Sequence, residues 1–81
     1  MSAEFIVVSI NENEEYEDTL ARTYTLTEAY DAQYNAYKQG DKTDILKLCA
    51  LKDVYGVETD QKAWIPVDVL IDIEKREQYN G

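Results

Sequence analysis

The sequence predicts an α+β fold: a small single domain over residues 1–81, with a short antiparallel sheet and a packed central helix. The 81 residues are 44% hydrophobic, which suits one core but leaves too little chain for two. Two short stretches rich in β-branched or aromatic residues lie near the N-terminus, and a longer amphipathic stretch follows them. We expect the element order ββαβα, with two alternatives: ββαββ, and a β-hairpin followed by three helices.

The first two elements are predicted to be strands. Residues 4–10 form a β-branched run of strand length. Residues 20–26 alternate loosely and contain threonine and tyrosine, which favour an extended backbone. Residues 11–18 between them are polar and strongly acidic. A polar link between two such stretches predicts an antiparallel hairpin.

The third element is predicted to be a helix that begins after Thr27 and ends before Gly40. Thr27 is expected to cap the N-terminus, and Gly40 stands where helices commonly end in a left-handed residue. Helical periodicity places two stripes of small or aromatic residues side by side. One stripe contains Ala29, Ala32 and Ala36, and the other contains Tyr30, Tyr34 and Tyr37. The alanines would let the helix approach a sheet closely, with the tyrosines beside that contact.

Residues 45–54 and 67–78 each fit two structures. In residues 45–54 both faces of an extended chain would be apolar, which favours a buried strand, although Gly56 would also suit the end of a helix. Residues 67–78 alternate like a strand, but Pro66 fits the first position of a helix. We expect a strand for the first segment and a helix for the second. Trp64, the only tryptophan, is expected in the core.

The composition argues against catalysis. With no histidine, one cysteine and three scattered glycines, the chain cannot form a His-dependent triad, an intramolecular disulfide, a cysteine pair for zinc or a glycine-rich phosphate loop. We therefore expect neither an enzyme nor a protein with a cofactor. Cys49 lies in an apolar run and is expected to be a small core residue in a reducing compartment. No stretch resembles a signal peptide or a membrane span, so a cytoplasmic location is expected.

Charge is the strongest indication of a partner. The formal charge is −9, and residues 1–37 carry eight acidic side chains against one basic side chain, a net −7. Such a field repels nucleic acids and anionic membranes and accelerates encounter with basic surfaces. We expect a protein partner with a basic surface, and no direct binding of nucleic acid or membrane.

The candidate partner-binding residues combine the acidic stretch with tyrosines, which are common at binding hot spots. The nine residues are Glu12, Glu14, Glu15, Tyr16, Glu17, Asp18, Tyr30, Tyr34 and Tyr37. The acidic stretch lacks the glycine and the ligand spacing of a calcium loop, so no metal site is expected.

These features lead to one main hypothesis and two alternatives. The main hypothesis is a non-catalytic protein-interaction module, or a small regulatory or inhibitory protein, that binds a basic partner surface. The first alternative is a nucleic-acid mimic whose carboxylates occupy the phosphate sites of a nucleic-acid-binding protein. The second is a self-associating assembly subunit, in which a thin core and an exposed strand edge gain from a second copy.

Overall fold

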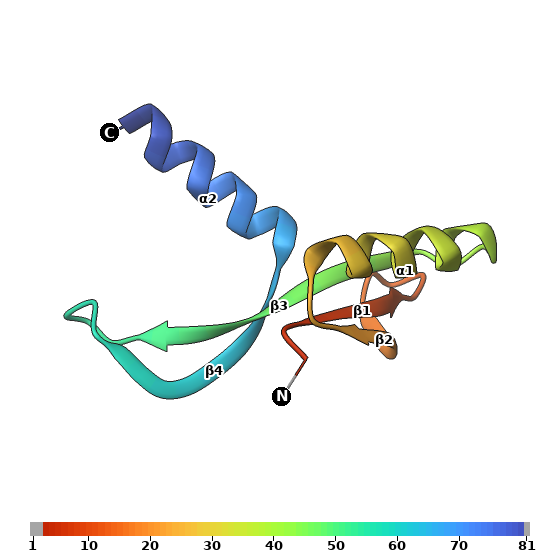
Figure 1. Cartoon of the computed structure of the whole chain (residues 1–81), viewed down its shortest axis with the longest axis horizontal. Helices are drawn as coiled ribbons and strands as arrows, with labels where there is room; N and C mark the ends of the chain where they lie inside the picture. The colour runs from red at the N-terminus through yellow and green to blue at the C-terminus, as the bar shows by residue number, and fades with distance from the viewer. Residues whose placement is uncertain (1–2, 81) are drawn as a thin grey trace. The chain divides into compact units, whose positions relative to one another are not determined.

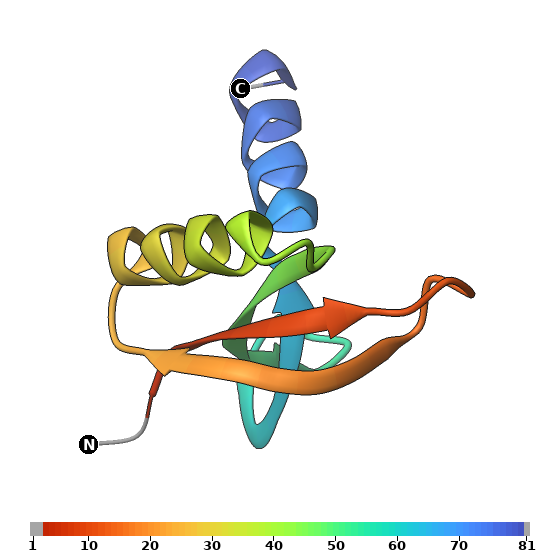
Figure 2. The same ribbon diagram turned by 90° about the vertical axis from the view of Figure 1, so that its right-hand side faces the viewer.

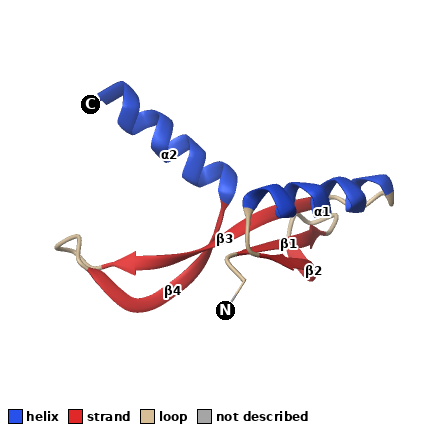
Figure 3. Ribbon diagram, viewed as in Figure 1, coloured by secondary structure: helices blue, strands red, loops and turns tan. Residues whose placement is uncertain are grey.

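The computed structural model describes the backbone of residues 3–80 and the side chains of residues 3–76. The element order is ββαββα (Figures 1 and 3). The elements are β1 (Phe5–Ile10), β2 (Tyr16–Thr23), α1 (Leu26–Lys38), β3 (Thr43–Lys52), β4 (Glu58–Pro66) and α2 (Val67–Asn80). The α+β class is confirmed, and the expected order ββαβα lacked one strand, β4.

The strands form one antiparallel sheet with the order β2-β1-β3-β4, so β2 and β4 are its edge strands. The chain also divides into two compact units, Met1–Leu46 and Lys47–Gly81, and β3 runs from the first into the second. The first unit contains β1, β2, α1 and the start of β3, and the second contains the rest of β3, β4 and α2. The candidate residues identified from the sequence all belong to the first unit.

The core of the first unit lies on both faces of β1. Phe5, Ile6, Val7 and Val8 are all buried. In the register with β2, Phe5 pairs with Thr23 and Val7 pairs with Ala21. Helix α1 packs against these two strands (Figure 2), and its Ala29 and Ala36 are buried. The predicted alanine stripe is therefore the packing face of α1.

Ile6 and Val8 of β1 also form a buried cluster with Leu46 of β3. A strand with both faces buried reads as a continuous apolar run rather than an alternating one. That is why residues 5–8 gave a clear signal in the sequence.

Helix α1 begins earlier than predicted. Its N-cap is Thr25 rather than Thr27, with extended backbone angles of φ −126° and ψ 155°. The Thr25 hydroxyl accepts a hydrogen bond from the Glu28 N–H at 3.2 Å and lies 3.0 Å from the Glu28 carboxylate, to which it donates. Glu28 thus favours Thr25 as the cap, because its N–H donates to the Thr25 hydroxyl and its carboxylate accepts from the same hydroxyl.

The predicted end of α1 is confirmed. Gly40 has a φ of +88°, where a side chain would be strained. Its N–H donates to the Tyr37 carbonyl and the Asp41 N–H donates to the Ala36 carbonyl, both at 3.0 Å. This pair of bonds is the Schellman arrangement that closes many helices at a glycine.

In the second unit, the expected strand at 45–54 and helix at 67–78 are confirmed as β3 and α2. Helix α2 follows β4 directly and contacts it. Pro66 ends β4 instead of beginning the helix, and Val67 is the first helical residue and is buried. Gly56 belongs to the turn between β3 and β4, so the alternative of a helix end there is wrong.

Two core predictions for this unit are also wrong. Trp64 lies on the edge strand β4 and keeps 36% of its surface exposed, and Cys49 on β3 is only half-buried. The unit buries few side chains because β4 is mostly polar and presents an exposed edge. Among the described residues, neither helix has the length and apolar character needed to cross a membrane.

Candidate protein-binding surface

The acidic stretch is an ordered turn between β1 and β2. The Asn11 side-chain oxygen accepts hydrogen bonds from the N–H groups of Asn13 at 2.9 Å and Glu15 at 3.0 Å. The Glu14 N–H donates to the Asn11 carbonyl at 3.0 Å, and Glu14 adopts a φ of 62°. Asn11 therefore organises a turn from which the side chains of Glu12, Glu14 and Glu15 are exposed.

The next three candidates lie on a strand rather than in a loop. Strand β2 begins at Tyr16, four residues before the predicted start, so Tyr16, Glu17 and Asp18 occupy the exposed edge of the sheet. The strand register shifts twice along β1, and at this point the Asp18 N–H bonds to the Ser9 hydroxyl at 3.0 Å. This pairing could not be predicted from the sequence, because the residues are polar and exposed.

A side-chain contact with β3 holds Tyr16 in place. Its hydroxyl donates a hydrogen bond of 2.8 Å to the Asp44 carboxylate. Partial burial, that hydrogen bond and the negative charge of Asp44 together raise the pKa of Tyr16 above its ordinary value of 10.0. Because the second oxygen of Asp44 accepts from the Ile45 N–H at 3.0 Å, the carboxylate is held at both ends.

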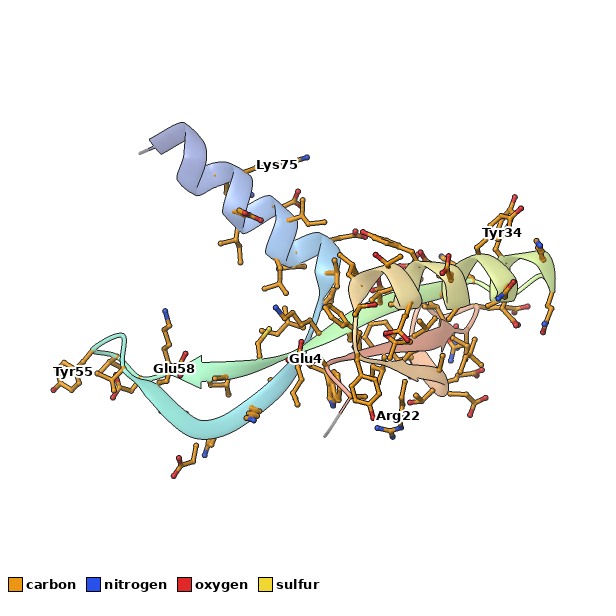
Figure 4. All side chains as sticks on the ribbon, in the orientation of Figure 1. Glu4, Arg22, Tyr34, Tyr55, Glu58 and Lys75 are labelled. Carbon is orange, nitrogen blue, oxygen red and sulfur yellow. The ribbon has the colours of Figure 1, made fainter. Side chains whose placement is uncertain are left out.

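The three helical tyrosines line a groove of about 390 Å³ on α1. Their rings are exposed, and the Tyr34 side chain projects outward from the helix (Figure 4). The rest of the lining comes from Gln33 of the helix and from the segment that leads into β3, residues 41–43. The predicted stripe of Tyr30, Tyr34 and Tyr37 is thus the wall of a groove.

Lys42 connects the groove to the acidic turn. It lines the groove, and its ammonium lies 3.7 Å from the Glu14 carboxylate. The Lys42 carbonyl accepts a hydrogen bond of 2.8 Å from the Ile10 N–H. The Lys42 and Glu14 side chains are 65% and 81% exposed, so their ion pair contributes about 1 kcal/mol or less. The backbone bond is therefore the stronger determinant of this arrangement.

A second lysine contacts an aromatic ring of the groove. The Lys38 ammonium lies 4.6 Å from the centre of the Tyr34 ring, within the range of a cation–π contact. Among the described residues, the acidic and cysteine side chains nowhere gather in a group of three that could hold a metal ion. The groups on this surface that could contact a partner protein are carboxylates, tyrosine rings and an amide side chain.

Sequence reasoning missed the segment 41–44, which joins the two parts of this surface. The sequence of this segment contains no motif that marks a binding site. Only the fold brings Lys42 beside Glu14 and Asp44 beside Tyr16. It also missed an apolar turn in the second unit, where Val54, Tyr55 and Val57 are 93%, 86% and 61% exposed (Figure 4). Their placement after Asp53 and around Gly56 is a turn signal that was available in the sequence.

No known protein family, curated protein or solved structure matches this chain. The chemistry of the surface itself is therefore the basis for a function.

Proposed function

We propose that this chain is a non-catalytic protein-interaction module whose first unit binds a basic surface of a partner protein. The observation that carries the proposal is the joining of the acidic turn to the tyrosine groove through Lys42. One continuous region then offers charge for attraction and aromatic rings for close contact. Tyrosine suits such contacts because its large ring loses little conformational freedom on binding.

The distribution of charge supports the same region. Residues 1–46 carry ten acidic and three basic side chains, a net −7, whereas residues 47–81 carry seven acidic and five basic side chains, a net −2. A field concentrated in one unit increases the rate of encounter with a basic surface and orients the approach. The five candidate carboxylates are all exposed, so they can contribute to this field without the cost of burial.

The test compares charge reversals in the two hairpins. The first variant combines Glu12→Lys, Glu15→Lys and Glu17→Lys, and the control combines Glu58→Lys and Asp60→Lys on β4, with both variants checked for folding by circular dichroism. Wild-type protein fixed to a surface is used to capture partners from a lysate of the native host, and the captured protein is then purified for kinetics.

We expect the association rate constant to fall at least about tenfold in the first variant at low salt, and to change little in the control. Wild-type association should also slow steeply as sodium chloride is raised. Equal losses in both variants, or binding that is independent of salt, would refute the proposal. Should the captured protein bind DNA or RNA, displacement of that nucleic acid by this chain would identify a mimic.

A second candidate function is self-association, and the exposed apolar turn of the second unit favours it. Contiguous exposed apolar side chains commonly mark contact sites, and Val54, Tyr55 and Val57 form such a group on one turn. Sedimentation velocity over a wide range of concentrations measures it directly. Self-association should weaken in the double variant Val54→Ser, Tyr55→Ser, and a wild-type protein that stays monomeric throughout rules it out.

A further inference from the structure

The tyrosine groove combines two features that attract a cation. Aromatic ring faces carry partial negative charge, and the Tyr30, Tyr34 and Tyr37 rings line one side of the groove. Asp41, an acidic residue, also lines the groove. A groove of about 390 Å³ lies near the lower end of the range for small-ligand sites, so it suits a single side chain.

The chain itself shows that a cation can approach these rings. The Lys38 ammonium already lies over the Tyr34 ring at 4.6 Å. Both residues are exposed, so this contact is weak, and Lys38 is not part of the groove lining. The cation of the lining itself, Lys42, has its ammonium 3.7 Å from Glu14, which offsets part of its repulsion of a positive ligand.

We propose that the groove binds the guanidinium group of an arginine side chain presented by the partner. Arginine fits better than lysine because its planar, weakly hydrated head stacks on aromatic rings while its N–H groups bond a carboxylate. The Tyr34 ring would provide the stacking face and Asp41 the acceptor. This inference rests on the proposed function, since it names the group by which a basic partner is recognised.

The test uses acetyl-arginine amide as the probe and acetyl-citrulline amide as its uncharged counterpart. Binding is followed by NMR through the ring signals of the tyrosines and the backbone signals of residues 30–43. We expect saturable shifts with the arginine probe in the millimolar range, centred on the groove, and at least about fivefold weaker binding of the citrulline probe.

Substitutions at Tyr34 and Asp41 then test which chemical groups of the groove bind the probe. Tyr34→Leu should abolish the shifts, whereas Tyr34→Phe should keep them, because the ring face and not the hydroxyl carries the contact. Asp41→Asn should weaken binding by about threefold or more, since it removes the charge and keeps the shape. Tyr55→Leu in the other hairpin is the matched control and should leave binding unchanged.

The variant Lys38→Met distinguishes cation binding in the groove from a structural role of Lys38. Removing the ammonium that lies over Tyr34 should tighten binding of the arginine probe by roughly two- to fivefold, because it removes a positive charge next to the ring that receives the probe. A merely structural role for Lys38 would leave the affinity unchanged or lower it. Equal shifts from the two probes, or full binding by Tyr34→Leu, would overturn the assignment of the groove.

The two proposals fail separately. If charge reversal in the acidic turn abolishes partner binding while the arginine probe gives no shifts, the assignment of the groove is wrong and the interaction module stands. If the probe binds with the expected pattern while charge reversal leaves partner association unchanged, the groove assignment stands and electrostatic attraction by the acidic turn is wrong.

Discussion

The two hairpin turns of this protein have the same hydrogen-bond framework and opposite surface chemistry. Residues 11–15 begin with Asn11 and residues 53–57 begin with Asp53. In each, the first side chain accepts from the N–H groups of the third and fifth residues, at 2.9 and 3.0 Å in one turn and 2.8 and 3.0 Å in the other. The fourth residue has a positive φ, 62° for Glu14 and 79° for Gly56.

The backbone bonds agree as well. The N–H of the first residue donates to the carbonyl of the fifth at 2.9 Å in both turns, and the N–H of the fourth donates to the carbonyl of the first at 3.0 Å. The first turn nevertheless exposes carboxylates, and the second exposes Val54, Tyr55 and Val57. The side-chain acceptor and the left-handed position define the turn, which leaves the remaining positions free to vary with function.

This similarity extends to the order of elements. A β-hairpin is followed by a helix in the first half of the chain, and a β-hairpin is followed by a helix in the second half (Figure 3). The sequence shows no internal repeat, because the two halves share only a few turn positions. A recurring ββα order can therefore arise from local turn and helix signals without recurring side chains in the core.

The largest expected effect follows from removing the shared side-chain acceptor. Asn11→Ala and Asp53→Ala should each lower the free energy of unfolding by about 1–2 kcal/mol, because each change deprives two backbone N–H groups of their partner. Asn11→Asp and Asp53→Asn keep an acceptor oxygen and should cost much less. Urea denaturation measures all four variants. If the alanine and acceptor-keeping variants were equally destabilised, the comparison of the two turns would fail.

A smaller effect, of opposite sign in the two turns, is expected at the fourth position. Gly56→Ala should destabilise the protein by about 1 kcal/mol, because a side chain at positive φ is strained even though the site is open. Glu14→Gly should instead stabilise it by about 0.5 kcal/mol, after subtraction of the weak ion pair with Lys42. Thermal unfolding of the pair provides the measurement, and equal signs would contradict it.

The smallest effect concerns the hydrogen bond from Tyr16 of the first hairpin to Asp44. The pKa of Tyr16 is raised in the folded state, so the unfolded state releases the tyrosine proton at lower pH. The contribution of Tyr16 to stability is therefore fully present below about pH 10 and is lost as the pH rises through the folded-state pKa. Tyr16→Phe should flatten the stability profile above pH 10, as measured by urea denaturation. An unchanged slope there would show that the Asp44 contact has no energetic role.

Several features could be predicted from the sequence because their signals are local. The α1 stop at Gly40 depends on a single residue with a positive φ, and the buried face of α1 follows from alanines at helical spacing. The start of α1 was misplaced by two residues because Thr25 and Thr27 are both acceptable caps, and the two hydrogen bonds between the Thr25 hydroxyl and Glu28 decide between them.

Strand β4 was missed for a different reason. Residues 58–66 are mostly polar, without the alternation that marks a strand with one buried face. As an edge strand, β4 is held by backbone hydrogen bonds to β3, and side-chain patterns carry no information about such bonds. The same reason explains why the sequence placed Tyr16, Glu17 and Asp18 in a loop.

By itself, the sequence determined which residues of the candidate surface are acidic or aromatic, where charge is concentrated and where α1 ends. The tertiary structure alone decided that these residues meet. The bond from Ile10 to Lys42 and the bond from Tyr16 to Asp44 join positions about thirty residues apart, and they bring the acidic turn beside the groove. Composition and helical periodicity act over a few residues, whereas strand pairing places distant residues together through the backbone.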